Sequence, residues 1–171
     1  MFPCIKGKRT SHTDTEENVS SILGRESFFM LVKEIMSGKV VSISPDENTA
    51  LAARLLSRYN IGALPVCTKE GKLRGMVTDR DIVLRCVAAG EEPEATKISH
   101  IMTRKVVHID AEDTVEKAVS LMGKEQIRRL PVEDKGKIVG MISLGDIAKA
   151  RSCTAETGEA LSEISENIRT I

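Results

Sequence analysis

Aromatic residues are nearly missing from this sequence. Three phenylalanines and one tyrosine make up 2% of its 171 residues, and there is no tryptophan. We therefore do not expect the stacking surfaces on which proteins hold single-stranded nucleic acids. The chain also lacks an excess of either charge, because 25 basic residues balance 25 acidic ones. A general nucleic-acid binder would carry a basic surplus, so we expect no nucleic-acid partner.

Long apolar runs are absent as well. No stretch approaches the roughly 18 consecutive apolar residues that would indicate a membrane span, and the N-terminal residues lack the apolar segment of a secretory signal. We expect a cytoplasmic protein with no membrane partner. The four cysteines, Cys4, Cys67, Cys86 and Cys153, are widely spaced. This spacing matches neither a zinc site nor a disulfide scaffold and predicts reduced, mostly buried thiols.

The sequence does contain an internal repeat. The pattern Ile-x-x-Leu-Pro-Val at residues 61–66 recurs 66 residues later, at 127–132. After a one-residue deletion in a polar turn, the pattern Gly-Met-x-x-x-x-Asp-Ile at residues 75–82 recurs 65 residues later, at 140–147. The register persists through the whole unit, which indicates a duplicated fold. Two halves that each leave an apolar face open should pack on each other about a pseudo-twofold axis.

Each half predicts the element order β-α-β-β-α, and hence the α/β fold class. The valine-rich segments 40–43 and 106–109 are predicted as short strands. The Ser-Pro-Asp-Glu segment at 44–47 is predicted to cap and open the next helix, with Asp110 as the matching cap. A Gly-containing hairpin turn at 69–72 then joins two strands.

The last helix of the first repeat should begin near Thr78 and end before Gly90. Its apolar residues exceed what one covering face needs, since Val83 and Val87 accompany Ile82. The surplus favours a partner chain, and the commonest closed solution is an isologous dimer.

The chain therefore divides into five predicted segments. They are a polar tail (1–27), the first repeat (28–90), a linker (91–97), the second repeat (98–152) and a C-terminal helix (153–171). The C-terminal helix is amphipathic and should dock on its own core or on a partner. The residues that share its apolar face are Leu161, Ile164, Ile168 and Ile171.

The duplicated patterns resemble those of tandem CBS-domain proteins, the paired module named after cystathionine β-synthase, and in particular the stand-alone bacterial type. The resemblance covers about residues 30–150. It implies a Bateman module, in which two repeats form clefts that hold an adenosyl ligand such as AMP, ADP, ATP, NAD or S-adenosylmethionine. It further implies a sensor with no catalytic role and no required cofactor, a homodimer, and a protein partner that the sequence does not name.

Thr78-x-x-Asp81 and Ser143-x-x-Asp146 match the family's Ser/Thr-x-x-Asp motif, whose aspartate accepts hydrogen bonds from the ribose hydroxyls. A carboxylate suits this task because it can accept from both hydroxyls of a vicinal diol. The same spacing is also that of a helix capping box. The sequence leaves ribose binding and helix capping open as alternatives.

The resemblance also implies where phosphates bind. Arg129 stands where related modules often carry a phosphate-binding arginine, and a guanidinium can hold a phosphate through two hydrogen bonds. A solvated arginine at a sheet edge is the alternative. Ala63 has the equivalent place in the first repeat, so phosphate charge is better matched on one side. Further candidates are Arg80, Lys39 and Lys105.

The adenine pocket of the family consists of backbone and aliphatic side chains near the first two strands of each repeat. In some relatives one cleft combines the base pocket of one repeat with the aspartate of the other, and the sequence leaves this pairing open. The resemblance assigns to the base pocket Met36, Val41, Ile61, Gly62 and Ala63 from the first repeat and Met102, Val107, Ile127 and Arg128 from the second.

Motifs of catalysis are not found. The chain has neither a P-loop nor a G-x-G-x-x-G pattern, and its three histidines have no nucleophile or carboxylate at motif spacing. The rival to a sensor is a structural or interaction module that forms a dimeric scaffold without nucleotide, with both Ser/Thr-x-x-Asp motifs acting only as caps. A small enzyme or metal protein is a third class, which metal analysis and a turnover assay would test.

Overall fold

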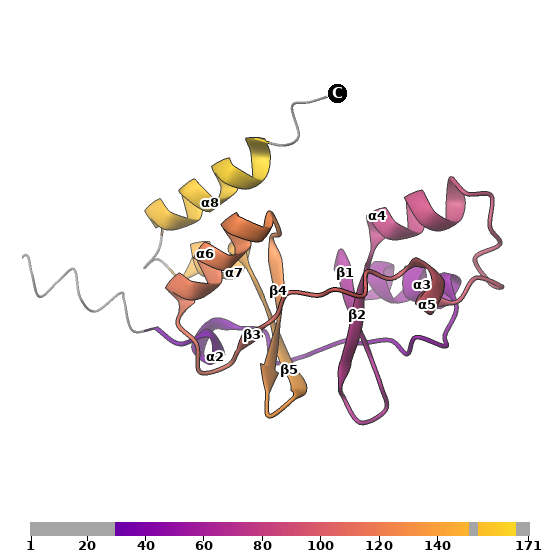
Figure 1. The fold of residues 1–171 in the computed structure, drawn as a ribbon, viewed down its shortest axis with the longest axis horizontal. Coiled ribbons are helices and arrows are strands. Elements are labelled where there is room, and N and C mark those ends of the chain that lie inside the picture. The colour runs from indigo at the N-terminus through magenta and orange to yellow at the C-terminus, as the bar shows by residue number, and fades with distance from the viewer. Residues whose placement is uncertain (1–29, 151–153, 167–171) are drawn as a thin grey trace, which may run out of the picture.

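The computed structural model describes residues 30–150 and 154–166, so the tail predicted at 1–27 lies outside the described residues. Two β-hairpins stand side by side in the middle of the molecule, and helices lie on the outer side of each hairpin (Figure 1). The two-repeat α/β architecture expected from the sequence is confirmed.

The two hairpins follow the repeat. The first half has a two-stranded antiparallel sheet, and the second half has a three-stranded sheet with one parallel pair. The repeated Leu-Pro-Val segments have the same register, because Pro65 pairs with Met76 and Pro131 pairs with Met141. The strands are β1 (Ala63–Cys67), β2 (Leu73–Thr78), β3 (Ile109–Asp110), β4 (Arg129–Asp134) and β5 (Lys137–Ser143).

The helices also repeat. The helix expected from near Thr78 to before Gly90 is present, although its second part has π-helical hydrogen bonding. The first half contains α2 (Val32–Ile35), α3 (Thr49–Tyr59), α4 (Asp79–Ile82) and the π-helix η2 (Val83–Val87). The second contains α5 (Ile98–Ile101), α6 (Val115–Glu125), α7 (Leu144–Lys149) and α8 (Thr154–Glu166).

The predicted strands at 40–43 and 106–109 are much shorter than expected. Only Ile43 pairs with β1, and only the last residue of the second segment enters β3. Ile43 donates its N–H to the Pro65 carbonyl at 3.0 Å and accepts from Cys67 at 2.9 Å. The next parallel bond would need an N–H on Pro65, which proline lacks. Pro131 ends the pairing of β3 in the same way.

The predicted N-caps of the two long helices are wrong. Asn48 caps α3 by accepting from the Leu51 N–H at 2.9 Å, and Thr114 caps α6. Ser44 and Asp110 instead begin tight turns, each accepting from the N–H two residues on. The side chains are cap formers, but they stabilise a turn four residues before each helix.

The two halves exchange their first helices. Val32 of α2 is buried in the core formed by α6, β4 and β5, whereas Ile98 and Ile101 of α5 are buried in the core formed by α3, β1 and β2. Each packed half therefore contains a segment that precedes the other repeat in the sequence. The segment expected as a linker at 91–97 is bonded to the start of α3, because the Thr49 N–H donates to the Thr96 carbonyl at 2.9 Å.

The C-terminal helix α8 folds back on its own chain and contacts α6 and α7. The expected apolar face is partly wrong. Ala160 is buried and Ile164 packs against the second core, whereas Leu161 is 43% exposed. Ile168 and Ile171 lie outside the described residues.

Candidate functional site

The Thr78-x-x-Asp81 motif forms where β2 ends and α4 begins. The Thr78 N–H and hydroxyl both donate to Oδ2 of Asp81, at 2.9 and 2.7 Å, and the Asp81 N–H donates back to the Thr78 hydroxyl oxygen at 3.1 Å. This is a complete capping box. The capping alternative is therefore realised, and it uses only one oxygen of the carboxylate.

The Ser143-x-x-Asp146 motif has the same geometry between β5 and α7. Oδ2 of Asp146 accepts from the Ser143 N–H at 3.0 Å and from its hydroxyl at 2.6 Å. Oδ1 has no hydrogen-bond partner within the part of the chain that the structure describes. Each motif thus leaves one carboxylate oxygen outside the cap.

The second oxygen differs between the motifs. Oδ1 of Asp81 lies 3.2 Å from the guanidinium of Arg85, one helical turn later. Arg85 also donates to the Ile101 carbonyl at 2.6 Å, so it ties α4 and η2 to the end of α5. The equivalent of Arg85 in the second repeat is Ala150, which cannot form such a pair. The carboxylate of Asp81 therefore has an ion-pair partner, whereas the carboxylate of Asp146 has none among the residues that the structure describes.

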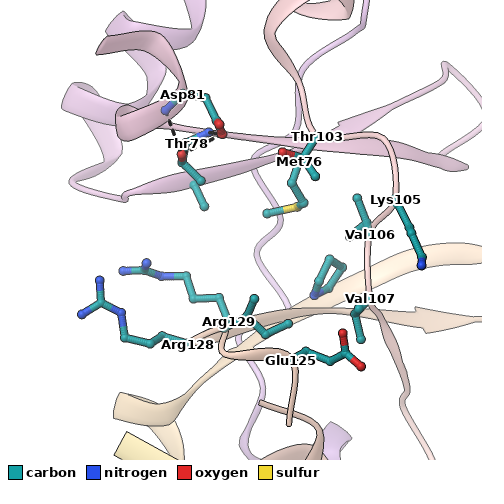
Figure 2. A pocket seen from close by; sticks show the side chains of 13 residues that line it. Met76, Thr78, Asp81, Thr103, Lys105, Val106, Val107, Glu125, Arg128 and Arg129 are labelled. Carbon is teal, nitrogen blue, oxygen red and sulfur yellow. Dashed lines mark hydrogen bonds between the residues drawn. The ribbon is translucent and has the colours of Figure 1, made fainter. Parts of the chain in front are cut away.

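A cavity of about 360 Å³ opens in front of the first motif. Thr78 and Asp81 form one wall of it, and the opposite wall comes from the second repeat (Figure 2). We call it the Thr78–Asp81 cleft. The predicted site residues that line it from the second repeat are Lys105, Val107, Ile127, Arg128 and Arg129.

A second cavity, also of about 360 Å³, opens in front of the second motif. Its composition mirrors the first, with Ser143 and Asp146 facing residues of the first repeat. We call it the Ser143–Asp146 cleft. The predicted site residues that line it from the first repeat are Lys39, Val41, Ile61 and Ala63. In both clefts, then, the motif of one repeat faces the aliphatic wall of the other, which answers the pairing that the sequence left open.

Four predicted site residues lie outside these linings. Arg80 is exposed on α4, and Gly62 lies behind the cleft wall beside the Arg129 guanidinium. Met102 is buried against Gly75, where a Cβ would lie 2.8 Å from the sulfur, and Met36 packs in the same way on Gly140. The methionines belong to the contacts made by the exchanged helices.

Other residues line the clefts without having been predicted. Met76 and Thr103 line the Thr78–Asp81 cleft, and their equivalents Met141 and Ser37 line the other one. The 66- and 65-residue offsets of the repeat could have indicated these residues as pairs, because equivalent residues line equivalent walls of the two clefts. One pair differs in chemistry: Glu125 lines the first cleft, and the chain's single tyrosine, Tyr59, lines the second.

The buried thiols contribute nothing to the clefts. Cys67 and Cys86 are buried and free, as expected. Burial, together with the nearby Glu133 carboxylate, raises the pKa of the Cys67 thiol to about 11. At neutral pH this thiol is protonated and a poor nucleophile.

The geometry of paired motifs and crossed clefts agrees with the comparison to known families. The CBS-domain family model matches residues 32–87 and 98–152. The chain belongs to the CBS-domain family. This CBS pair is 40% identical over 134 residues to the CBS domain-containing protein YhcV of Bacillus subtilis, an alignment that covers 78% of this chain and 94% of YhcV.

Solved structures show the same arrangement. Hypoxic Response Protein I with two coordinated zinc ions is similar with a TM-score of 0.66 and 32% identity, covering 70% of this CBS pair and 98% of that chain. The CBS domain pair of protein MJ0100, in complex with 5′-methylthioadenosine and S-adenosyl-L-methionine, has a TM-score of 0.65 and 30% identity, with coverage of 71% and 95%.

The described part of this CBS pair contains neither a cluster of metal-binding side chains nor a membrane-spanning helix. Within residues 30–150 and 154–166, no group of three or more His, Cys, Asp or Glu side chains is arranged to hold a metal ion. None of the helices in the described part of the chain is both long and apolar enough to span a membrane.

Proposed function

We propose that this CBS pair is a regulatory sensor that binds an adenosyl ligand in one or both clefts. The observation that carries the proposal is the crossed composition of each cleft, in which a Ser/Thr-x-x-Asp motif of one repeat faces an aliphatic wall of the other. The carboxylate oxygen outside each cap suits ribose hydroxyls, although that of Asp81 is shared with Arg85, and the aliphatic residues of the opposite wall suit a base. The ligands bound to the MJ0100 pair, 5′-methylthioadenosine and S-adenosyl-L-methionine, both contain adenosine and support this class.

The crossed composition also gives a mechanism for signalling. A ligand in either cleft touches both repeats, so its affinity depends on how the hairpins sit against each other. It shifts the population toward the shape that it binds more tightly, and only by the ratio of its two affinities. We propose that a protein partner reads this shape, and that the signalling unit is a homodimer.

A panel of ligands tests the proposal. AMP, ADP, ATP, NAD, S-adenosylmethionine and adenosine are added separately to the full chain, and Tm and heats of binding are measured. A ligand present at 100 times its Kd should stabilise the fold by about 2.7 kcal/mol. Guanosine and GMP serve as matched controls for the base. If none of the adenosyl ligands raises Tm or gives a heat of binding, the sensor proposal fails.

The failure of all six ligands would favour a scaffold that binds no nucleotide. One observation supports that second function: each Ser/Thr-x-x-Asp motif forms a complete capping box from its own side chains. In a scaffold, the two motifs would serve only to start α4 and α7. Substitutions of Asp81 or Asp146 would then lower the stability of the fold and leave its affinity for a partner unchanged.

A further inference from the structure

Arg129 lies on the lining of both clefts, and so does Ala63. These two residues are equivalent in the repeat, and each begins the first strand of its hairpin. The repeat therefore brings the same position from both halves to the region between the clefts. One of these positions has a guanidinium and the other has only a methyl group.

The guanidinium of Arg129, a residue of the second repeat, lies against the first repeat. Both of its terminal nitrogens lie 3.6 Å from the point where a Cβ of Gly62 would be, so the group rests against the first repeat. Oδ2 of Asp79 lies 3.5 Å from the same point, without forming an ion pair with Arg129. The Arg129 side chain is exposed, and its guanidinium has no hydrogen bond or ion pair to any residue that the structure describes. Its five donors are available to a ligand.

The other charges favour the Thr78–Asp81 cleft for an anion. Figure 2 shows Arg128 and Arg129 extending together on the side where Thr78 and Asp81 lie, whereas Glu125 points the other way. The counterpart of Arg128 is Gly62, so the other cleft has no such pair. Arg85 offsets the charge of Asp81 at 3.2 Å, and Asp146 forms no ion pair within residues 30–150 and 154–166.

We propose that the two clefts share Arg129 as their common phosphate-binding guanidinium, so that phosphate-bearing ligands bind with negative coupling. The first such ligand takes the Thr78–Asp81 cleft, where the guanidinium of Arg128 lies on the same side as that of Arg129. On the described lining of the Ser143–Asp146 cleft, Lys39 is then the one cation left for a phosphate, and the carboxylate of Asp146 opposes it. An uncharged nucleoside does not use the guanidinium and still binds there. This inference rests on the proposed function for its adenosyl ligands.

The repeat itself supplies the decisive variant. Ala63→Arg provides a second guanidinium at the position equivalent to Arg129, and Ala63→Gln is the matched control of similar reach without charge. Stepwise Kd values for AMP and for adenosine are measured by calorimetry with the full chain. In the wild type, we expect the second AMP to bind at least tenfold more weakly than the first, beyond the fourfold that statistics alone give two equal sites.

The two substitutions at Ala63 should have different effects on the ratio of the two AMP affinities. Ala63→Arg should bring the two AMP affinities to within about fivefold of each other, and Ala63→Gln should not. The ratio of the two adenosine affinities should be the same in both variants. Arg129→Ala should weaken AMP and leave adenosine nearly unchanged. Two equal and independent AMP sites in the wild type, or an AMP ratio that Ala63→Arg does not change, would overturn the sharing of Arg129.

Inorganic pyrophosphate separates this inference from the proposed function, because it has no adenosine. We expect one pyrophosphate per chain in the wild type, two in Ala63→Arg and none in Arg129→Ala. If adenosine and AMP fail to bind but pyrophosphate follows this pattern, the adenosyl function is wrong and the shared guanidinium stands. If adenosine binds, but AMP binds no more tightly than adenosine or its extra affinity does not depend on Arg129, the sensor proposal stands and the sharing of Arg129 is wrong.

Discussion

At the scale of a single residue, Asp146 combines a helix cap with a place on a cleft lining. One carboxylate oxygen holds the capping box of α7, the other has no partner among the described residues, and the residue lines the Ser143–Asp146 cleft. An alanine substitution would remove the cap together with the proposed ligand contact and so confuse a loss of binding with a loss of the cap. An asparagine keeps an oxygen that can accept from Ser143, and it removes the charge that suits a diol.

We expect Asp146→Asn to weaken one adenosyl binding step at least tenfold while Tm changes little. Thr114→Ala is the matched control, because it removes the N-cap of α6 away from the clefts. The control should lower stability by about 1 kcal/mol and leave affinity unchanged. Calorimetry and thermal unfolding measure the two effects. Unchanged affinity in Asp146→Asn would leave this aspartate with a capping role only.

The burial of Cys67 leads to a prediction about how the stability of the fold depends on pH. Its pKa rises from about 9 to about 11 on folding, because the thiol is buried. The unfolded chain loses this proton first, so the stabilising contribution is complete below pH 9 and is lost as the pH rises toward 11. A difference of this size is worth on the order of 2 kcal/mol.

Urea unfolding at pH 8 and pH 10.5 measures the loss. The decrease in the free energy of unfolding should be smaller in Cys67→Ala than in the wild type. Cys86→Ala, at the other buried free cysteine, is the matched control and should keep the decrease of the wild type. An equal decrease in all three proteins would assign the pH dependence to other groups.

At the scale of the element, the sequence predicts the order of helices and strands because the repeat was visible twice. It does not predict how the halves meet. Met36 and Met102 were expected in the adenine pocket, but the exchange of α2 and α5 places them against Gly140 and Gly75. The two glycines were already in the repeated pattern, and only the packed structure shows what requires them.

The candidate site was likewise predictable from the sequence only in part. The local motifs Thr78-x-x-Asp81 and Ser143-x-x-Asp146 were readable, since a cap depends on residues three apart. The pairing of each motif with the opposite repeat depends on how the two hairpins pack, which no local pattern contains. The short first strands were readable in principle, because Pro65 lacks the N–H that a longer pairing would need.

Gly75 tests the contact between the exchanged segment and its hairpin. A Cβ there would lie 2.8 Å from the Met102 sulfur and 2.8 Å from the Thr103 carbonyl oxygen. The sulfur can move, but the carbonyl belongs to a backbone pairing in which the Met76 and Thr103 N–H groups each donate to the other residue's carbonyl, at 2.9 and 2.8 Å. We expect Gly75→Ala to cost about 1–3 kcal/mol.

Gly38→Ala is the matched control, because no atom lies within 4 Å of a Cβ at that position. Urea unfolding should show little change in the control. Since Thr103 also lines the Thr78–Asp81 cleft, ligand affinity should fall in Gly75→Ala. Equal stability in the two variants would mean that the segment 102–103 yields easily and does not fix the hairpin.

At the scale of the whole molecule, the two repeats differ in the outer surface that they present. Val83, Leu84 and Val87 on η2 are 55%, 53% and 61% exposed. The residues equivalent to the first two are Ala148, which is small, and Lys149, which is charged. Among the described residues, the first repeat therefore has a cluster of large exposed apolar side chains here that the second repeat does not share, and such a surface favours association.

We expect a homodimer that joins the η2 surfaces of two chains about a twofold axis, the commonest closed arrangement. Light scattering at tens of micromolar should give a mass near twice 18.7 kDa. Val83→Glu should weaken the dimer at least tenfold, because it would bury a charge in an apolar interface. Ala148→Glu, at the equivalent position of the second repeat, should leave it intact. A wild-type monomer would instead assign the η2 surface to a different partner protein, and equal weakening by both variants would place both repeats in the interface.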